Sequence, residues 1–168
     1  MNINGTEIER KFLIKRYAPK IDGETVWDIV QTYLLRGDPD IQRRVRKITV
    51  NGSAEYFYTE KKFVSDKVRR ENERKITRDE YEILLKEADR ELEPIIKTRR
   101  IFDYKGQSFE MDEYPFSQEL ATVELELENT EQSVILPPFL DFVKEVTGDK
   151  RYSNAAMAKA GQFPENII

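Results

Sequence analysis

The chain has 168 residues, of which 39% are hydrophobic and 36% are charged, and its 28 basic and 32 acidic residues give a net charge of −4. This near balance argues against a surface that coats DNA or RNA, which would be strongly basic. Cysteine and histidine are both absent from the sequence, which excludes thiolate chemistry, cysteine-based zinc sites and catalytic pairs that need a histidine. Any bound metal must therefore be held by oxygen ligands.

The chain also lacks the signs of a membrane or secreted protein. No segment approaches the roughly 18 consecutive apolar residues of a membrane span, and the N-terminus does not have the pattern of a signal peptide. No linker, repeat or low-complexity tract divides the sequence, which predicts one domain over residues 1–168. The absence of cysteine favours a reducing compartment, so we expect a cytoplasmic protein without a membrane partner.

Most of the chain has the pattern of β-strands. Eight strands are predicted at residues 8–14, 25–35, 41–50, 54–63, 69–77, 95–104, 107–114 and 121–127. Turn signals such as Asn51-Gly52 and Lys105-Gly106 join neighbouring strands. Consecutive strands connected by such short turns pair in antiparallel fashion.

Three segments have helical patterns instead. The first begins with a capping box, Thr77 to Glu80, continues to Leu92 with apolar residues on one face, and ends before Pro94. Pro137-Pro138 is predicted to open a second helix, which carries apolar residues up to Gly148. The third is the alanine-rich segment 154–159. We expect these helices to cover an apolar face of the strands.

Charged residues recur at positions i and i+2 of the predicted strands, where two side chains share one face. These sets are Glu7, Glu9 and Lys11; Arg44 and Arg46; Thr59 and Lys61; Arg69, Glu71 and Glu73; Lys97 and Arg99; Glu110 and Asp112; and Glu124 and Glu126. The simplest interpretation of any one pair is the water-facing side of an antiparallel sheet. However, basic residues dominate the middle strands, while acidic residues dominate the first, seventh and eighth.

Like charges on one strand face repel each other, so the repeated like pairs indicate ligands of opposite charge. Glu124 and Glu126 would bind a cation, and Arg44 and Arg46 would bind an anion. A closed barrel with the charged faces inside and helices packed outside would account for both.

The segment from Glu7 to Lys11 resembles the E-x-E-x-K motif of the CYTH family, the triphosphate tunnel metalloenzymes. Further segments resemble family motifs in the same order along the chain: Gln31 to Leu34, Arg44 to Arg46, Thr59 to Lys61, Arg69 to Glu73, Lys97 to Arg99, Glu110 to Asp112, Glu124 to Glu126, and Val146 to Asn154. The resemblance implies a mainly β (α+β) fold: an eight-stranded antiparallel closed barrel, the triphosphate tunnel, with flanking helices.

The resemblance also implies roles for individual residues. Binding of the triphosphate is assigned to Lys11, Arg44, Arg46, Lys61, Arg69, Lys97 and Arg99. Binding of Mg²⁺ or Mn²⁺, as one ion or two, is assigned to Glu7, Glu9, Asp112, Glu124 and Glu126, and the catalytic step to Glu7, Glu9 and Lys11. Glu71, Glu73 and Glu110 either join the metal site or hold basic side chains in position.

The implied activity is metal-dependent hydrolysis of a small triphosphate, with inorganic tripolyphosphate as the expected substrate and orthophosphate as the product. A class IV adenylate cyclase, which converts ATP to cAMP and pyrophosphate, and a thiamine triphosphatase are the alternative enzymes. A polyphosphate- or nucleotide-binding module is the non-enzymatic alternative. The expected partner is a small triphosphate and not a nucleic-acid polymer.

Overall fold

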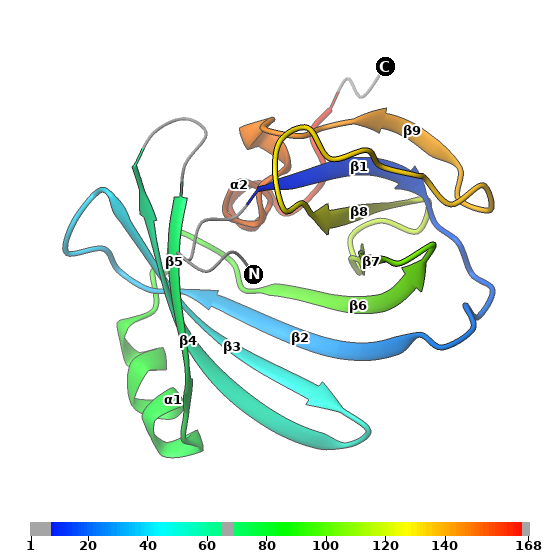
Figure 1. The fold of residues 1–168 in the computed structure, drawn as a ribbon. Coiled ribbons are helices and arrows are strands. Elements are labelled where there is room, and N and C mark those ends of the chain that lie inside the picture. The colour runs from blue at the N-terminus through cyan, green and yellow to red at the C-terminus, as the bar shows by residue number, and fades with distance from the viewer. Residues whose placement is uncertain (1–7, 65–68, 166–168) are drawn as a thin grey trace.

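In the computed structural model, which describes residues 8–64 and 69–165, nine strands form one antiparallel sheet in the order β5-β4-β3-β2-β6-β7-β8-β1-β9 (Figure 1). The strands are β1 (Glu9–Lys15), β2 (Thr25–Tyr33), β3 (Ile41–Val50), β4 (Ser53–Phe63), β5 (Arg69–Ile76), β6 (Ile95–Tyr104), β7 (Gln107–Glu113), β8 (Leu120–Glu126) and β9 (Phe142–Glu145). The sheet curls strongly around a concave face (Figure 1). The mainly antiparallel architecture with flanking helices is therefore confirmed.

Each of the eight predicted strands is present to within two residues at either end. The two hairpin turns also form as predicted. Asn51 and Gly52 have φ angles of 50° and 80°, and Lys105 and Gly106 have φ angles of 49° and 72°. A tight turn with two positive φ angles matches the twist of the flanking strands, so these dipeptides fix the register of β3 with β4 and of β6 with β7.

Closure into an eight-stranded barrel is not observed. The strand order ends at β5 on one side and at β9 on the other, and no ladder joins these two edges within the described residues. The sequence predicts a helix after Pro137-Pro138. This prediction is wrong, because the segment contains the ninth strand, β9. Residues Phe142–Glu145 instead pair with β1, Glu145 lying opposite Phe12. This pairing satisfies the backbone groups along one side of β1, which would otherwise form an open edge.

The first helix is shorter than predicted. Thr77 caps helix α1 (Arg78–Leu84) by accepting a hydrogen bond from the backbone nitrogen of Glu80 at 3.1 Å. A 3₁₀ turn, η1 (Leu85–Glu87), follows it. The chain then pairs with the end of β2 through a bridge between Ala88 and Leu34, so tertiary pairing ends the helix before Leu92.

The third predicted helix is confirmed as α2 (Asn154–Ala160), which ends at Gly161 with a φ angle of 70°. It follows the 3₁₀ turn η2 (Lys150–Tyr152). Met157 of α2 packs with Leu13, Tyr33 and Tyr114 in one buried cluster. Other clusters pack around Phe102 and Phe109 and between Val45 and Tyr81 of α1.

None of the helices within residues 8–64 and 69–165 is long and apolar enough to cross a bilayer.

Candidate active site

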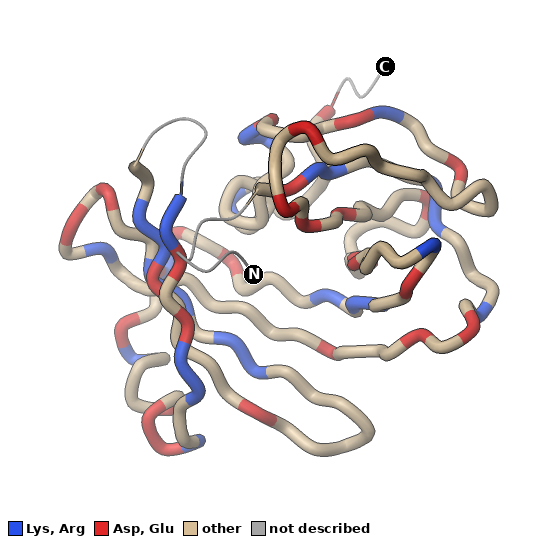
Figure 2. Tube along the Cα trace, in the orientation of Figure 1, with Lys and Arg blue, Asp and Glu red and all other residues tan. Residues whose placement is uncertain are grey.

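The concave face of the sheet contains a cavity of about 870 Å³. The predicted site residues that line it are Glu9, Lys11, Arg44, Arg46, Lys61, Arg69, Glu71, Glu73, Lys97, Arg99, Glu110, Glu124 and Glu126. Figure 2 shows how acidic and basic positions follow the strands around this face. Of the remaining predictions, Asp112 is not part of the lining, and Glu7 lies outside the described residues.

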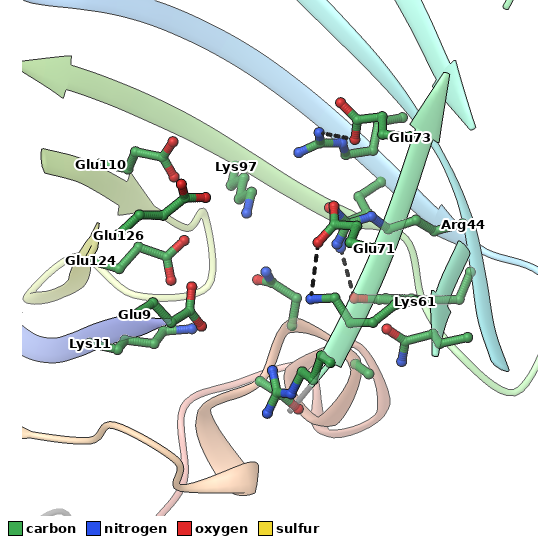
Figure 3. A pocket seen from close by; sticks show the side chains of 18 of the residues that line it. Glu9, Lys11, Arg44, Lys61, Glu71, Glu73, Lys97, Glu110, Glu124 and Glu126 are labelled. Carbon is green, nitrogen blue, oxygen red and sulfur yellow. Dashed lines mark hydrogen bonds and ion pairs between the residues drawn. The ribbon is translucent and has the colours of Figure 1, made fainter. Parts of the chain in front are cut away.

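One wall of the cavity is basic and comes from β3, β4 and β5. Arg44 and Arg46 project from β3 with the spacing expected for one strand face. Arg44 Nη2 lies 3.2 Å from Glu71 Oε1, and Arg46 Nη2 lies 2.7 Å from Glu73 Oε2. Lys61 Nζ lies 3.6 Å from the other oxygen of Glu71. Glu71 and Glu73 therefore hold basic side chains in position, which was one of the two roles considered for them (Figure 3).

Lys97 and Arg99 of β6 share one buried carboxylate behind the cavity surface. Lys97 Nζ lies 2.8 Å from Asp112 Oδ2, and Arg99 Nε lies 2.7 Å from Asp112 Oδ1. Asp112 is only 3% exposed. Both of its oxygens thus bind these two cations, and we propose that Asp112 positions Lys97 and Arg99. Its role as a metal ligand stays a prediction.

Burial and charge shift the pKa values of this triad. Burial alone would raise the pKa of Asp112, but Arg99 and Lys97 outweigh it and hold the pKa well below its usual range. Burial, together with repulsion from Arg99, lowers the pKa of Lys97 to about 8, although Asp112 opposes this change. The triad is thus a compact charged unit at the base of the cavity.

The opposite wall is acidic and comes from β1, β7 and β8. The register places Glu9 opposite Glu126 and Glu110 opposite Glu124, and Figure 3 shows these four carboxylates directed into the cavity. The nearby charge of Glu124, and secondly burial, raise the pKa of Glu9 to about 7. Burial likewise raises the pKa of Glu110, although Arg99 opposes this.

This wall has the chemistry of a site for a hard divalent cation. Its donors are carboxylate oxygens, which Mg²⁺ and Mn²⁺ prefer, and its mutual repulsion would be relieved by a bound cation. Within residues 8–64 and 69–165 no three acidic side chains are already grouped tightly enough to hold one ion. The residues fit such an ion by type and charge, and its binding would draw their carboxylates together.

Two uncharged residues of the cavity belong to the segment Gln31 to Leu34, which resembles a family motif but was given no role from the sequence. Gln31 and Tyr33 on β2 are 0% and 4% exposed, and Gln31 Nε2 donates to Tyr33 Oη at 2.7 Å. They occupy positions i and i+2 of one strand face, which is the signal that identified the charged pairs. Lys150, Ser153 and Asn154 also line the cavity from the C-terminal segment.

A second, smaller cavity of about 240 Å³ adjoins the first. It is lined mainly by apolar side chains, namely those of Trp27, Ile48, Val50 and Phe57, with Ser53 and Glu55 at its edge. Trp27 borders both cavities. Trp27 therefore lies between the charged site and an apolar cavity.

Comparison with known proteins gives this arrangement a family. The model of the CYTH domain matches residues 5–139 of the chain. The chain belongs to the CYTH family. A curated relative, an inorganic triphosphatase of Nitrosomonas europaea, is 35% identical over 165 residues, which cover 91% of this chain and 97% of the relative.

Solved structures of other CYTH-like proteins share the fold. One, described as an inorganic triphosphatase, is 31% identical with a TM-score of 0.59, and the match covers 91% of this chain and 94% of that chain. A protein from Pyrococcus horikoshii OT3 is 20% identical with a TM-score of 0.53, and the match covers 74% of this chain and 81% of that chain. Because its sequence identity is low, the similarity to the Pyrococcus protein shows a shared fold and nothing about function.

Proposed function

We propose that this CYTH protein hydrolyses inorganic tripolyphosphate in a metal-dependent reaction and releases orthophosphate. The observation that carries the proposal is a single cavity with a basic wall on β3 to β5 and an acidic wall on β1, β7 and β8. The basic wall suits the anionic phosphates, and the acidic wall suits the cation that accompanies them. The Nitrosomonas relative, named as an inorganic triphosphatase, supports the same substrate.

In this proposal the phosphate oxygens contact Lys11, Arg44, Arg46, Lys61, Arg69, Lys97 and Arg99. A hydrogen bond to a charged group contributes about 1.5–3 kcal/mol, so several of them hold a small polyanion without further contacts. Phosphoryl transfer depends mainly on positioning and charge neutralisation. Glu71, Glu73 and Asp112 hold the cations in place before the substrate arrives.

Glu9, Glu124 and Glu126 would hold Mg²⁺ or Mn²⁺, and Glu7 remains a further proposed ligand. When bound, the cation neutralises phosphate oxygens and makes a water molecule more acidic. The carboxylate of Glu9, whose pKa is raised to about 7, accepts the proton of the attacking water. Lys11, whose Nζ donates to the backbone oxygen of Tyr152 at 2.9 Å, orients the substrate beside it.

The test is to incubate the protein with tripolyphosphate and Mg²⁺ or Mn²⁺, and in parallel with excess EDTA, and to measure orthophosphate. We expect release with either metal and none with EDTA. Equal release in EDTA would contradict the metal-dependent reaction. Tight binding of tripolyphosphate without turnover under any of these conditions would support the binding module instead.

An adenylate cyclase is the second candidate, and the small apolar cavity beside Trp27 favours it because a nucleobase requires such a surface. Incubation with ATP distinguishes the two, since a cyclase yields cAMP and pyrophosphate and a hydrolase yields orthophosphate. Thiamine triphosphate is the third substrate for this assay. The cytoplasmic location and the lack of a nucleic-acid partner stay predictions from the sequence.

A further inference from the structure

The buried amide of Gln31 has one oxygen for which the fold provides no hydrogen-bond donor. Gln31 is fully buried on β2 and lines the main cavity. Its nitrogen Nε2 donates to Tyr33 Oη at 2.7 Å, while its oxygen Oε1 has no hydrogen-bond partner within the described residues. Most buried polar atoms have a partner, so a half-satisfied amide at the base of a cavity indicates a role in the site.

The orientation of this amide follows from its neighbours. Arg46 lies directly opposite Gln31 on β3. The positive guanidinium of Arg46 attracts the amide oxygen of Gln31 and repels the amide N–H groups, so the oxygen is favoured on the Arg46 side. The nitrogen then points to Tyr33 and occupies an acceptor position of its hydroxyl oxygen. The hydroxyl proton of Tyr33 cannot be donated back to Gln31, because an amide nitrogen is not an acceptor.

The Tyr33 hydroxyl is thereby left with a proton to donate into the cavity. Within residues 8–64 and 69–165 Tyr33 donates no hydrogen bond to the protein, and its side chain lines the cavity next to Arg44. Burial raises the pKa of this phenol, although Arg44 and Gln31 oppose the rise. Tyr33 is therefore a neutral donor at working pH and not a base.

We propose that Gln31 is a positioning residue that directs the hydroxyl proton of Tyr33 to an oxygen of the bound triphosphate. A phosphate oxygen can accept this hydrogen bond, and the described residues provide no acceptor for the Tyr33 proton. This inference rests on the proposed function for the identity of the anion. It goes beyond that function in assigning a substrate contact to an uncharged pair of residues on β2.

The test uses three variants, Gln31→Met, Tyr33→Phe and the double variant, together with Gln31→Glu. Affinity for tripolyphosphate is measured by calorimetry in EDTA, where no turnover is needed, and kcat and KM are measured with Mg²⁺. Loss of one hydrogen bond to a charged oxygen corresponds to a roughly 10- to 100-fold weaker affinity. We expect this loss for Tyr33→Phe, a loss of up to the same size for Gln31→Met, and no further loss in the double variant.

Gln31→Glu provides the sharpest comparison because a carboxylate has nearly the same size but can only accept a hydrogen bond. It should turn the Tyr33 proton inward and weaken binding at least as much as Gln31→Met. Retained affinity in Gln31→Glu, or additive losses in the double variant, would overturn the proposal. Gln118→Met, at an exposed position, and Tyr104→Phe, outside the cavity, are the controls and should bind normally.

Thermal stability separates this role from a purely structural one. Gln31→Met removes a buried, unpartnered oxygen, so its melting temperature should stay the same or rise while its affinity falls. A parallel fall of stability and affinity would indicate that Gln31 only supports the strand. If wild-type protein binds tripolyphosphate in EDTA but releases no orthophosphate with metal, the proposed function fails, while the binding test of Gln31 still stands.

Discussion

At the scale of single residues, the acidic wall is unfavourable until a cation occupies it. Glu124 is the main cause of the raised pKa of Glu9, so Glu124→Gln removes a repulsion as well as a proposed metal ligand. It also removes the ion pair of Glu124 Oε1 with Arg99 Nη2 at 3.6 Å. We expect the metal-free variant to melt at the same temperature as wild type or higher, because the lost repulsion offsets the lost ion pair. With Mg²⁺ its activity should fall by about a hundredfold or more, as expected when a charge-stabilising group is removed.

Differential scanning fluorimetry and phosphate release measure these two effects. Glu128→Gln, at an exposed position just beyond β8, is the matched control and should leave both quantities unchanged. Full activity of Glu124→Gln, or a lower melting temperature without metal, would contradict the assignment of Glu124.

Asp112 has the opposite character, since it stabilises the fold by pairing with two buried cations. Asp112→Asn would leave Lys97 without its counter-charge at 2.8 Å, and Arg99 would keep the less buried Glu110 and Glu124 at 3.0 and 3.6 Å. Breaking a buried pair in this way costs about 3–5 kcal/mol. Urea unfolding measures the loss. Glu55→Gln removes one partner of a pair whose side chains are 62% and 53% exposed, so it should cost about 1 kcal/mol or less. Similar losses in the two variants would argue against the proposed role of Asp112.

The pKa values of Glu9 and Lys97 predict how activity depends on pH. Glu9 must lose its proton, with a pKa of about 7, and Lys97 must keep its proton, with a pKa of about 8. These values belong to the metal-free protein, and a bound cation favours the charged carboxylate and so lowers the pKa of Glu9. A plot of kcat/KM against pH should therefore be bell-shaped, with its acid limb at or below pH 7 and its alkaline limb near pH 8. Glu9→Gln should remove the acid limb along with most of the activity, and an acid limb retained near pH 7 would exclude Glu9 as its source.

The sign of the effect on stability follows from the same shift. Because the pKa of Glu9 is raised in the folded state, its contribution to stability is present below the unfolded value of 4.5 and is lost as pH rises through about 7. Metal-free wild type should thus lose more stability between pH 5 and pH 7.5 than Glu9→Gln does. Thermal melts of both proteins at these two pH values provide the comparison.

At the scale of elements, β9 explains how the sheet ends. The ring of Phe142 packs edge-on against Phe12 of β1, with centroids 5.4 Å apart. Phe142→Ala should therefore reduce the free energy of unfolding by about 2 kcal/mol, somewhat less than for a fully buried phenylalanine. Val143→Ala on the same strand, where Val143 is 38% exposed, should cost much less. Urea unfolding of both variants measures the difference, and equal losses would show that this packing does not hold β9 in place.

The sequence was sufficient to predict elements that depend on neighbouring residues. It was insufficient where pairing with a strand far away in the chain determines the local structure. The eight strands follow from alternation and from turns such as Asn51-Gly52. The predicted helix after Pro137-Pro138 fails because the edge of β1, more than a hundred residues earlier, pairs with this segment. Helix α1 stops early for the same reason, since Ala88 pairs with Leu34.

The candidate site shows the same division. Spacing along each strand identified the charged residues that converge on the cavity, because strand geometry fixes which side chains share a face. Spacing did not show that Asp112 pairs with Lys97 and Arg99, since this pairing depends on the register that sets Asp112 opposite Arg99. Gln31 and Tyr33 lie in a segment that resembles a family motif, but charge spacing gave them no role because both residues are uncharged and form hydrogen bonds instead.

At the scale of the whole molecule, the curl of the sheet separates the two charges of the site. A flat sheet would spread the acidic strands β1, β7 and β8 and the basic strands β3, β4 and β5 along one surface. Curvature brings them to opposite walls of one cavity, as Figure 3 shows. An anion held by the basic wall then meets a cation held by the acidic wall, even though no ladder joins β5 to β9 within the described residues.

This arrangement predicts how the protein ranks its triphosphates. In the proposed function the basic side chains contact phosphate oxygens, and these contacts would supply most of the binding energy whether or not a nucleoside is attached. The small cavity beside Trp27 offers a nucleobase an apolar surface. Tripolyphosphate should therefore be hydrolysed with a kcat/KM at least equal to that of ATP, and ATP should yield no cAMP.

A cyclase must hold the ribose so that its 3′ oxygen faces the α-phosphorus, and it would bind tripolyphosphate only as an inhibitor. Chromatography of the products from each substrate decides between the two reactions. Trp27 is the only tryptophan of the chain and borders both cavities, so quenching by ATP that exceeds the quenching by tripolyphosphate reports a nucleobase beside it. Quenching by ATP together with cAMP and pyrophosphate as the main products would reverse the ranking, while the charged cavity and its metal-binding wall would serve the cyclase equally well.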